Sequence, residues 1–146
     1  MSQTQLTTYL KDLLADSYIV MLKTQNYHWN VTGLHFHSLH EMFQEQYEDL
    51  FEAVDELAER IRAIGSQAPG TFQQFQQLSK IDSEDIKTKD VEMLKSLIGD
   101  HKKLVETGRK VIAEAQKEND DATMDMAIKR VQTHDKHIWM LESSLE

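Results

Sequence analysis

Cysteine is absent from the 146 residues of this chain, and proline and glycine are scarce. Without cysteine the protein has no disulfide, no iron–sulfur ligation and no thiolate zinc site, so any metal must be held by nitrogen and oxygen ligands. The absence of cysteine also fits the cytoplasm. Pro69 is the single proline and there are five glycines, so long uninterrupted helices can form.

Long apolar runs and clusters of basic residues are missing as well. No stretch approaches the roughly eighteen apolar residues of a membrane span, and the first residues lack the basic and apolar regions of a secretory signal. We therefore expect no membrane partner and a cytoplasmic location. The formal net charge is −9, and the 16 Lys and Arg are scattered along the chain. Such a charge favours cations over nucleic acid as ligands.

Apolar residues recur at helical spacing in four long segments, and strand-like alternation is absent from the sequence. The first predicted helix runs from about Thr4 to Val31 and ends before Gly33, which suits a left-handed position. The second follows Ser38, which can form a capping box with Glu41, and ends at Gly65.

The second half of the chain predicts three further helices. A short one spans Phe72 to Leu78, a long one follows Asp90 as N-cap and reaches about Lys117, and the last runs from about Ala122 to Leu145. The sequence therefore predicts an all-α four-helix bundle, with a short helix in the long connection between the second and third long helices. Residues 1–146 are expected to form a single domain.

Four of the seven histidines lie between His28 and His40, in a segment otherwise built for burial. This concentration of imidazoles indicates a metal site. Ferritin-type di-iron bundles usually carry Glu-x-x-His on single helices. No Glu of this chain has a His three residues later, so a di-iron centre within one subunit is not expected.

One stripe of the second predicted helix carries four residues that can bind metal, namely His40, Gln44, Asp55 and Glu59. At ~100° per residue they lie within ~100° of one another around the helix. His40 and Asp55 are nevertheless ~22 Å apart along the axis at ~1.5 Å per residue. They cannot hold one ion within one straight helix.

The stripe is symmetric about its midpoint. The outer residues, His40 and Glu59, are equally far from that point, and so are the inner ones, Gln44 and Asp55. In an antiparallel pair of these helices from two subunits, His40 of one meets Glu59 of the other, and the contact occurs twice. His28 can add a second imidazole, and two imidazoles with carboxylates suit Fe(II). Exposed acids on a helix are also typical of a solvated face, so the pattern alone leaves both interpretations open.

Three blocks of the sequence, NYHWNVTGLHFHSLHEMF, DELAERIRAIG and DKHIWMLESSLE, closely resemble the Dps family, the DNA-binding proteins from starved cells or mini-ferritins. The resemblance covers essentially the whole chain. It implies a ferritin-like subunit, assembled through two-fold dimers into a hollow dodecamer that oxidises Fe(II), preferentially with hydrogen peroxide, and stores ferric iron. It also implies that each iron site takes His28 and His40 from one subunit and Asp55 and Glu59 from its partner.

Two residues beside this implied site need separate interpretation. Many family members have an Asp where this chain has Gln44, whose neutral carbonyl is a weaker ligand, so a second iron position loses a negative charge. The resemblance implies that Trp29 is an electron donor that quenches radicals. Trp is also enriched at interfaces, and we favour packing alone.

The remaining histidines are predicted to be structural. We expect His35 and His37 to cap the loop and the helix start rather than bind iron. His101 is predicted to lie on the surface among lysines. His134 and His137 are three residues apart and able to chelate metal, but we expect them to pack.

Two sets of carboxylates have implied roles in iron traffic. Asp120, Asp121 and Asp125 cluster at the start of the last helix, where acids also complement the helix dipole. The resemblance places this segment at three-fold pores, where carboxylates would concentrate Fe(II). The second predicted helix carries further acids, some of which would nucleate mineral on the inner wall: Glu41, Glu45, Glu48, Glu52 and Glu56.

Three functions follow as hypotheses. The first is a peroxide-dependent ferroxidase and iron store. The second is a DNA-condensing nucleoid protein, which we do not favour because the first ten residues contain no Lys or Arg and the chain ends in LESSLE. The third is a cage that has lost its chemistry through Gln44.

Overall fold

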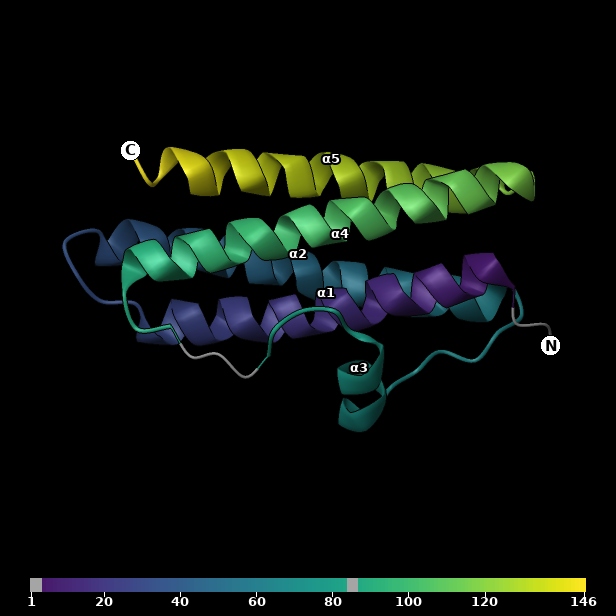
Figure 1. Ribbon diagram of the computed structural model, residues 1–146, viewed down its shortest axis with the longest axis horizontal. Coiled ribbons are helices and arrows are strands. Elements are labelled where there is room, and N and C mark those ends of the chain that lie inside the picture. Colours follow the sequence, from purple (N-terminus) through teal and green to yellow (C-terminus); the bar gives the residue numbers. More distant parts are fainter. Residues whose placement is uncertain (1–3, 84–86) are drawn as a thin grey trace.

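The computed structural model describes residues 4–83 and 87–146, and these residues form helices and connections without any strand (Figure 1). Four helices are long and one is short: α1 (Gln5–Asn30), α2 (Phe36–Ala63), α3 (Phe72–Leu78), α4 (Asp90–Lys117) and α5 (Asp121–Ser143). The predicted all-α bundle, with a short helix in the connection between the second and third long helices, is confirmed.

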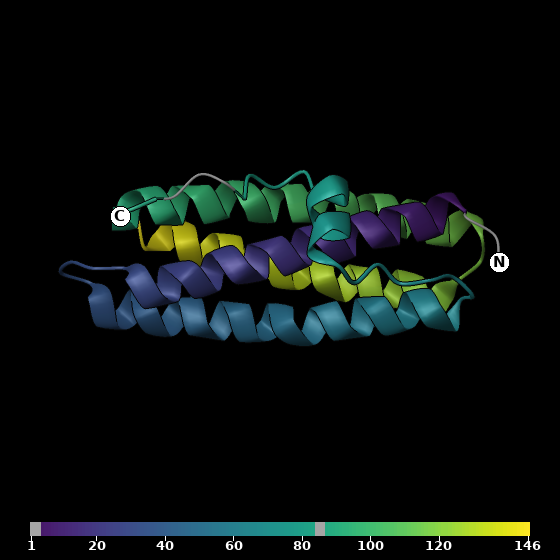
Figure 2. The same cartoon turned by 90° about the horizontal axis from the view of Figure 1, so that it is seen from below.

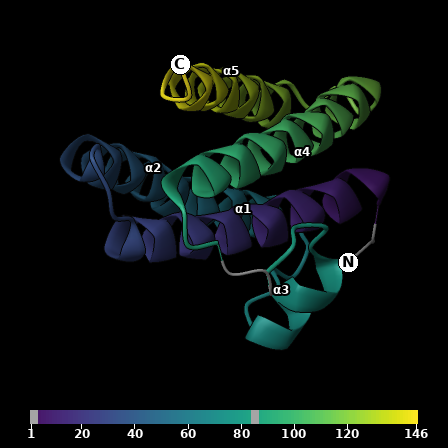
Figure 3. The same ribbon diagram turned by 60° about the vertical axis from the view of Figure 1, so that its left-hand side comes forward.

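The long helices pack as two antiparallel pairs, α1 with α2 and α4 with α5 (Figures 1 and 2). The connection after α2 returns along the length of the bundle, so α4 starts at the same end as α2. Its short helix α3 lies outside the bundle against α1 (Figure 3). No helix within the described residues is long and apolar enough to cross a membrane.

The core follows the helical spacing of the apolar residues. Each long helix turns one stripe inward, and the fully buried leucines include Leu6, Leu10, Leu13, Leu14, Leu50, Leu57, Leu97 and Leu104. Burying a Leu side chain stabilises the fold by roughly 1.5–3 kcal/mol. Leu22 belongs to the same apolar pattern in the sequence, but it is 49% exposed on the outer face of α1.

The predicted start of α2 at a Ser38 capping box is wrong. The helix begins at Phe36, with His35 at the N-cap position and no side-chain hydrogen bond to the cap. A tight turn at Gly33 (φ +118) brings the Phe36 N–H to the Gly33 carbonyl at 3.2 Å, and this turn leads directly into the helix. The Ser38 hydroxyl therefore lies within the first turn and donates to the His35 carbonyl at 3.2 Å instead of capping.

The boundaries of the second half are close to those predicted. The short helix α3 spans the predicted residues and starts with a capping box between Thr71 and Gln74. Asp90 is the first residue of α4 rather than its N-cap, and its carboxylate accepts from the Val91 N–H at 2.8 Å. The last helix α5 ends at Ser143, two residues before the predicted end.

A buried carboxyl group attaches the long connection to α1. Asp16 is fully buried, and its Oδ1 accepts from the Ser79 hydroxyl at 2.7 Å and from the Lys80 N–H at 2.8 Å. Burial raises the pKa of Asp16, although these hydrogen bonds and the charge of Lys80 partly oppose the shift. The ionised form is thus disfavoured by folding, and this penalty grows as the pH rises through the folded-state pKa.

Two substitutions separate the hydrogen bonds of Asp16 from its charge. Asp16→Ala leaves the Ser79 and Lys80 donors without their acceptor, and we expect it to lower the free energy of unfolding by about 1–3 kcal/mol. Asp16→Asn keeps a carbonyl acceptor and has no charge to desolvate, so it should be at least as stable as the wild type at pH 7. Guanidinium unfolding followed by helical circular dichroism measures both. An Asn variant as unstable as the Ala variant would contradict this account.

Candidate metal centre

Two histidine rings meet where α1 ends and α2 begins. His28 lies in the last turn of α1 and His40 in the first turns of α2, and the turn at Gly33 reverses the chain between them. The two rings stack with centroids 3.8 Å apart and planes inclined by 12°. His28 is 7% exposed and His40 is half-buried, so the pair opens to one side of the subunit.

Reciprocal hydrogen bonds fix the orientation of both rings. The Nδ1 of His28 is 2.7 Å from the His40 carbonyl oxygen, and the Nδ1 of His40 is 2.6 Å from the His28 carbonyl oxygen. Because a carbonyl only accepts, each Nδ1 carries the hydrogen, and the lone pair of each neutral ring lies on Nε2. A backbone carbonyl bonded to one ring nitrogen is the usual support for a histidine that binds metal through the other. The pair therefore fits a metal.

Aromatic side chains hold the pair from both sides. The ring of Phe36 stacks on His40 at 5.0 Å, and the ring of Tyr47 approaches His28 edge-on at 5.3 Å. Trp29, the neighbour of His28 in the chain, is 59% exposed. Its indole therefore lies on the outside of the subunit, so packing against another subunit stays a prediction.

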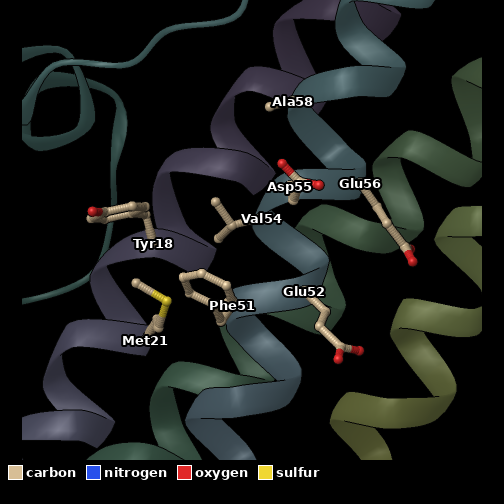
Figure 4. A pocket seen from close by; sticks show the side chains of 8 residues that line it. All are labelled: Tyr18, Met21, Phe51, Glu52, Val54, Asp55, Glu56 and Ala58. Atoms are coloured by element: carbon tan, nitrogen blue, oxygen red, sulfur yellow. The ribbon is translucent and has the colours of Figure 1, made fainter.

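The two predicted carboxylate ligands lie far from the histidine pair along α2. Asp55 and Glu59 are both exposed. Asp55 lines a groove between α1 and α2 whose floor is apolar, with Tyr18 and Met21 from α1 facing Phe51 and Val54 from α2 (Figure 4). Within residues 4–83 and 87–146, no three His, Asp or Glu side chains come together in a way that could hold a metal ion.

The side chain of Gln44 is exposed on the same face of α2 as His40. Its Nε2 donates to Glu48 Oε1 at 2.9 Å, one turn further along the helix. This bond uses the donor end of the amide and leaves the carbonyl oxygen available as a neutral ligand.

The three acids at the start of α5 differ in their surroundings. Asp120 is the N-cap of α5 and accepts from the Thr123 N–H at 3.0 Å, and it pairs with Arg60 of α2 at 3.0 Å. Burial raises its pKa, but the hydrogen bonds from Thr123 and the charge of Arg60 outweigh this effect and lower it. Asp121 and Asp125 are exposed, and Asp125 pairs with Lys129 at 3.2 Å.

The other two histidines of the His28–His40 segment are exposed. His35 occupies the N-cap position of α2 through its backbone. His37 forms a pair with Glu41 one turn later, with His37 Nε2 3.1 Å from Glu41 Oε1. Neither ring caps α2, so the predicted capping role of these side chains is wrong, and His35 serves as N-cap through its backbone alone.

The predicted surface position of His101 is wrong. Its ring is 0% exposed and lies inside the bundle with His134 and His137, whose predicted packing is confirmed. Residue 101 falls on the inward stripe of α4 between Leu97 and Leu104, while the lysines that follow it point outward. The 3–4 spacing of this stripe was the signal in the sequence.

An ion pair next to these histidines, between buried Arg130 and partly exposed Asp49, had no signal in the sequence. Arg130 of α5 donates through both terminal nitrogens to Asp49 of α2, at 3.1 and 3.0 Å. Burial raises the pKa of Asp49, but hydrogen bonds from His137 and Arg130 outweigh this effect and hold it well below its usual value. Burial also lowers the pKa of His101 to about 3 and that of His134 well below its usual value.

Comparison with known proteins places this chain among ferritin-like proteins. Residues 7–146 match the family model of the ferritin-like domain. The "DNA protection during starvation protein" of Helicobacter pylori is 33% identical over 93% of this chain and 95% of that protein.

Solved structures agree with these matches. The crystal structure of a Dps protein from Bacillus brevis superimposes with a TM-score of 0.94, at 31% identity, over 100% of both chains. The Dps protein from Vibrio cholerae, described as a member of the ferritin-like diiron-carboxylate superfamily, superimposes with a TM-score of 0.92 at 28% identity, over 97% of this chain and 89% of that one. The chain therefore belongs to the Dps family of ferritin-like proteins.

Proposed function

We propose that this protein binds and oxidises Fe(II) at a site shared by two copies of the chain, and that it stores the ferric product. His28 and His40 come from one subunit, and Asp55 and Glu59 from the other. The observation that carries the proposal is the histidine pair, in which both Nδ1 atoms are held by backbone carbonyls and both Nε2 atoms are left for a ligand. The related Vibrio cholerae structure belongs to the diiron-carboxylate superfamily, which supports iron as the metal.

A second copy of the chain is the source of the carboxylates, for a geometric and a chemical reason. Along the straight α2, Asp55 lies ~22 Å from His40. An antiparallel α2 from a two-fold partner brings the partner's Asp55 and Glu59 to this histidine pair. Large apolar side chains are exposed on α1 and α2, namely Leu22 at 49%, Trp29 at 59% and Phe51 at 67%, and contact with a second copy through these helices would bury them. Trp29 thereby gains the interface packing predicted for it.

The proposed ligands suit the chemistry. Imidazole nitrogen and carboxylate oxygen together bind Fe(II), and two carboxylates stabilise the higher charge of the ferric product. Two Fe(II) ions supply two electrons, which reduce one hydrogen peroxide to two waters with the uptake of two protons. We propose peroxide as the preferred oxidant and a hollow dodecamer, built from these dimers, as the store. The net charge of −9 per chain favours cation uptake by such a shell.

The exposed acids of α5 are the proposed entry route for iron. Asp121 and Asp125 have free access to solvent, whereas the Asp120 carboxylate is engaged by Arg60 and Thr123. Rings of carboxylates at three-fold pores would raise the local concentration of Fe(II). Asp120 then serves mainly to fix the start of α5, as an N-cap.

Protection of DNA is a second candidate function, because the Helicobacter pylori relative carries that name. We propose that any protection by this protein acts through removal of Fe(II) and peroxide rather than through DNA condensation. A net charge of −9 repels phosphate backbones.

The shared site can be tested by mixing two inactive variants. One carries His28→Ala and His40→Ala, and the other carries Asp55→Ala and Glu59→Ala. Each alone should show background ferroxidase activity, because every site lacks one half of its ligands. Random co-assembly gives half of the dimers as mixed, each with one complete site of two, so about a quarter of the wild-type rate should return.

Ferric absorbance after addition of Fe(II) and peroxide measures this rate. Co-assembly from unfolded chains is verified by mass spectrometry, and a variant with His35→Ala and His37→Ala serves as a control that should keep full activity. A mixture that remains at background after verified co-assembly would contradict the shared site.

Gln44→Asp should strengthen the second iron position, because it places a negative charge beside His40. We expect anaerobic titration with Fe(II) to show at least ~10-fold tighter binding of the second ion, equivalent to about 1.4 kcal/mol. Gln132→Asp adds the same charge at an exposed position of α5 and should leave this affinity unchanged. If Gln44→Asp and the wild type bind the second Fe(II) ion with equal affinity, Gln44 is not part of the site.

A gel shift tests DNA binding. At ~150 mM salt, where exposed charges more than ~8 Å apart are largely screened, we expect no stable complex with duplex DNA at pH 7. Tight, salt-resistant complexes would favour the nucleoid function instead.

A further inference from the structure

Three histidine rings form a buried cluster between α2, α4 and α5, apart from the proposed iron site. His101 comes from α4, and His134 and His137 come from α5. The ring centroids of His101 and His134 are 5.2 Å apart, those of His101 and His137 are 5.2 Å apart, and those of His134 and His137 are 6.4 Å apart. No group suited to a metal ion occurs here or elsewhere in the described part of the chain. The cluster therefore needs a different explanation.

Arg130 determines where the protons of the first two rings lie. A guanidinium only donates, and Arg130 Nη2 is 3.3 Å from His134 Nε2, so this nitrogen must accept. A neutral His134 therefore carries its hydrogen on Nδ1. That atom is 3.0 Å from His101 Nδ1, to which it donates. A neutral His101 in turn carries its hydrogen on Nε2.

Asp49 determines the state of the third ring. Its ionised carboxylate only accepts, and Asp49 Oδ2 is 3.1 Å from His137 Nε2 and 3.0 Å from Arg130 Nη2. His137 therefore donates through Nε2, and in its neutral form it has a lone pair on Nδ1. Both His137 Nδ1 and His101 Nε2 are buried without a hydrogen-bond partner among the described residues.

The direction of these bonds decides what a further proton does. A proton on His134 must go to Nε2, where it faces the N–H of Arg130. A proton on His101 must go to Nδ1, where it faces the N–H of His134. Each of these breaks a hydrogen bond and places two donors against each other.

We propose that Asp49, Arg130, His134, His101 and His137 form a proton-sensitive anchor that ties α2 to α4 and α5. The anchor is intact while His101 and His134 are neutral, and it opens when a proton reaches His134 or His101. Four charged or titratable groups surround His137. They are Asp49 from α2, His101 from α4, and Arg130 and His134 from α5. The anchor requires no iron chemistry and lies apart from the proposed iron site.

The pH dependence of stability follows from His101 and His134, the two histidines that accept a hydrogen bond within the cluster. Burial lowers the folded-state pKa of His101 from 6.5 to about 3, and burial also lowers that of His134. The unfolded chain therefore binds these protons first as the pH falls. The stability contribution of each ring is complete above about pH 6.5 and is lost progressively below it. At pH 5 the loss is ~30-fold in the folding equilibrium constant for His101, and the loss for His134 has the same direction.

Nitrogen-15 NMR of the assembled, histidine-labelled protein tests the bond directions. At pH 7.5 the signal that disappears in His134→Gln should be a neutral ring with its hydrogen on Nδ1, the less common tautomer in water. It should remain neutral down to pH 5. A His134 ring that is charged at pH 7.5, or that carries its hydrogen on Nε2, would overturn the proposal.

Guanidinium unfolding of the full chain at pH 7.5 and pH 5 tests the switch. His134→Gln is the informative variant, because an amide can accept from Arg130 and donate to His101 but cannot take up a proton. We expect the folding equilibrium constant of this variant to fall less than that of the wild type between the two pH values, because one ring whose pKa is lowered in the folded state has been removed. The control His37→Gln removes an exposed histidine, and its folding equilibrium constant should fall as much as that of the wild type.

An equal fall of the folding equilibrium constant in His134→Gln and the wild type would contradict the proposal. If His134→Gln does not fold, His101→Gln provides the same comparison, since its carbonyl accepts from His134 and its side chain does not titrate. A smaller fall in His101→Gln supports the anchor, and an unchanged fall overturns it.

Discussion

The straightness of α2 is the constraint on which the functional architecture depends. Its 28 residues form one uninterrupted helix, so the ends of its polar stripe stay ~22 Å or more apart. His40 meets His28 at one end because the chain reverses at Gly33, while Asp55 and Glu59 remain exposed toward the other end. The proposed ligands of one subunit therefore do not meet within that subunit. In the function proposed above, an antiparallel copy of the same helix supplies the missing ligands.

The bundle holds this helix from the side opposite the stripe. Asp49 lies ~180° around α2 from His40, and it is bound by Arg130 and His137 of α5. Nearer the end of α2, Arg60 pairs with the N-cap Asp120 of α5. The two helices make few other contacts, so these polar links are the main connection between α2 and α5. Buried charged groups cost stability unless they are paired, so breaking one of these links should be destabilising.

The parts of this structure that depend on spacing within one helix could be predicted from the sequence. The boundaries of α3 and the stripe on α2 are examples, because apolar periodicity and capping residues act locally. The start of α2 was misplaced, since a turn at Gly33 replaces the Ser38 cap. The burial of His101 was missed because the adjacent lysines suggested a surface, although residue 101 continues the apolar stripe of α4. The Asp49–Arg130 pair joins residues 81 apart and leaves no local pattern.

The central claim is that each iron site takes ligands from two subunits. Crystals of the assembled protein soaked anaerobically in Fe(II), with data collected at the iron absorption edge, locate the metal directly by anomalous scattering. We predict an iron atom bound by the Nε2 atoms of His28 and His40 and by Asp55 and Glu59 of a two-fold related subunit. Iron bound by the histidine pair with no carboxylate from a neighbouring subunit, or iron absent from this position at saturating Fe(II), would contradict the account.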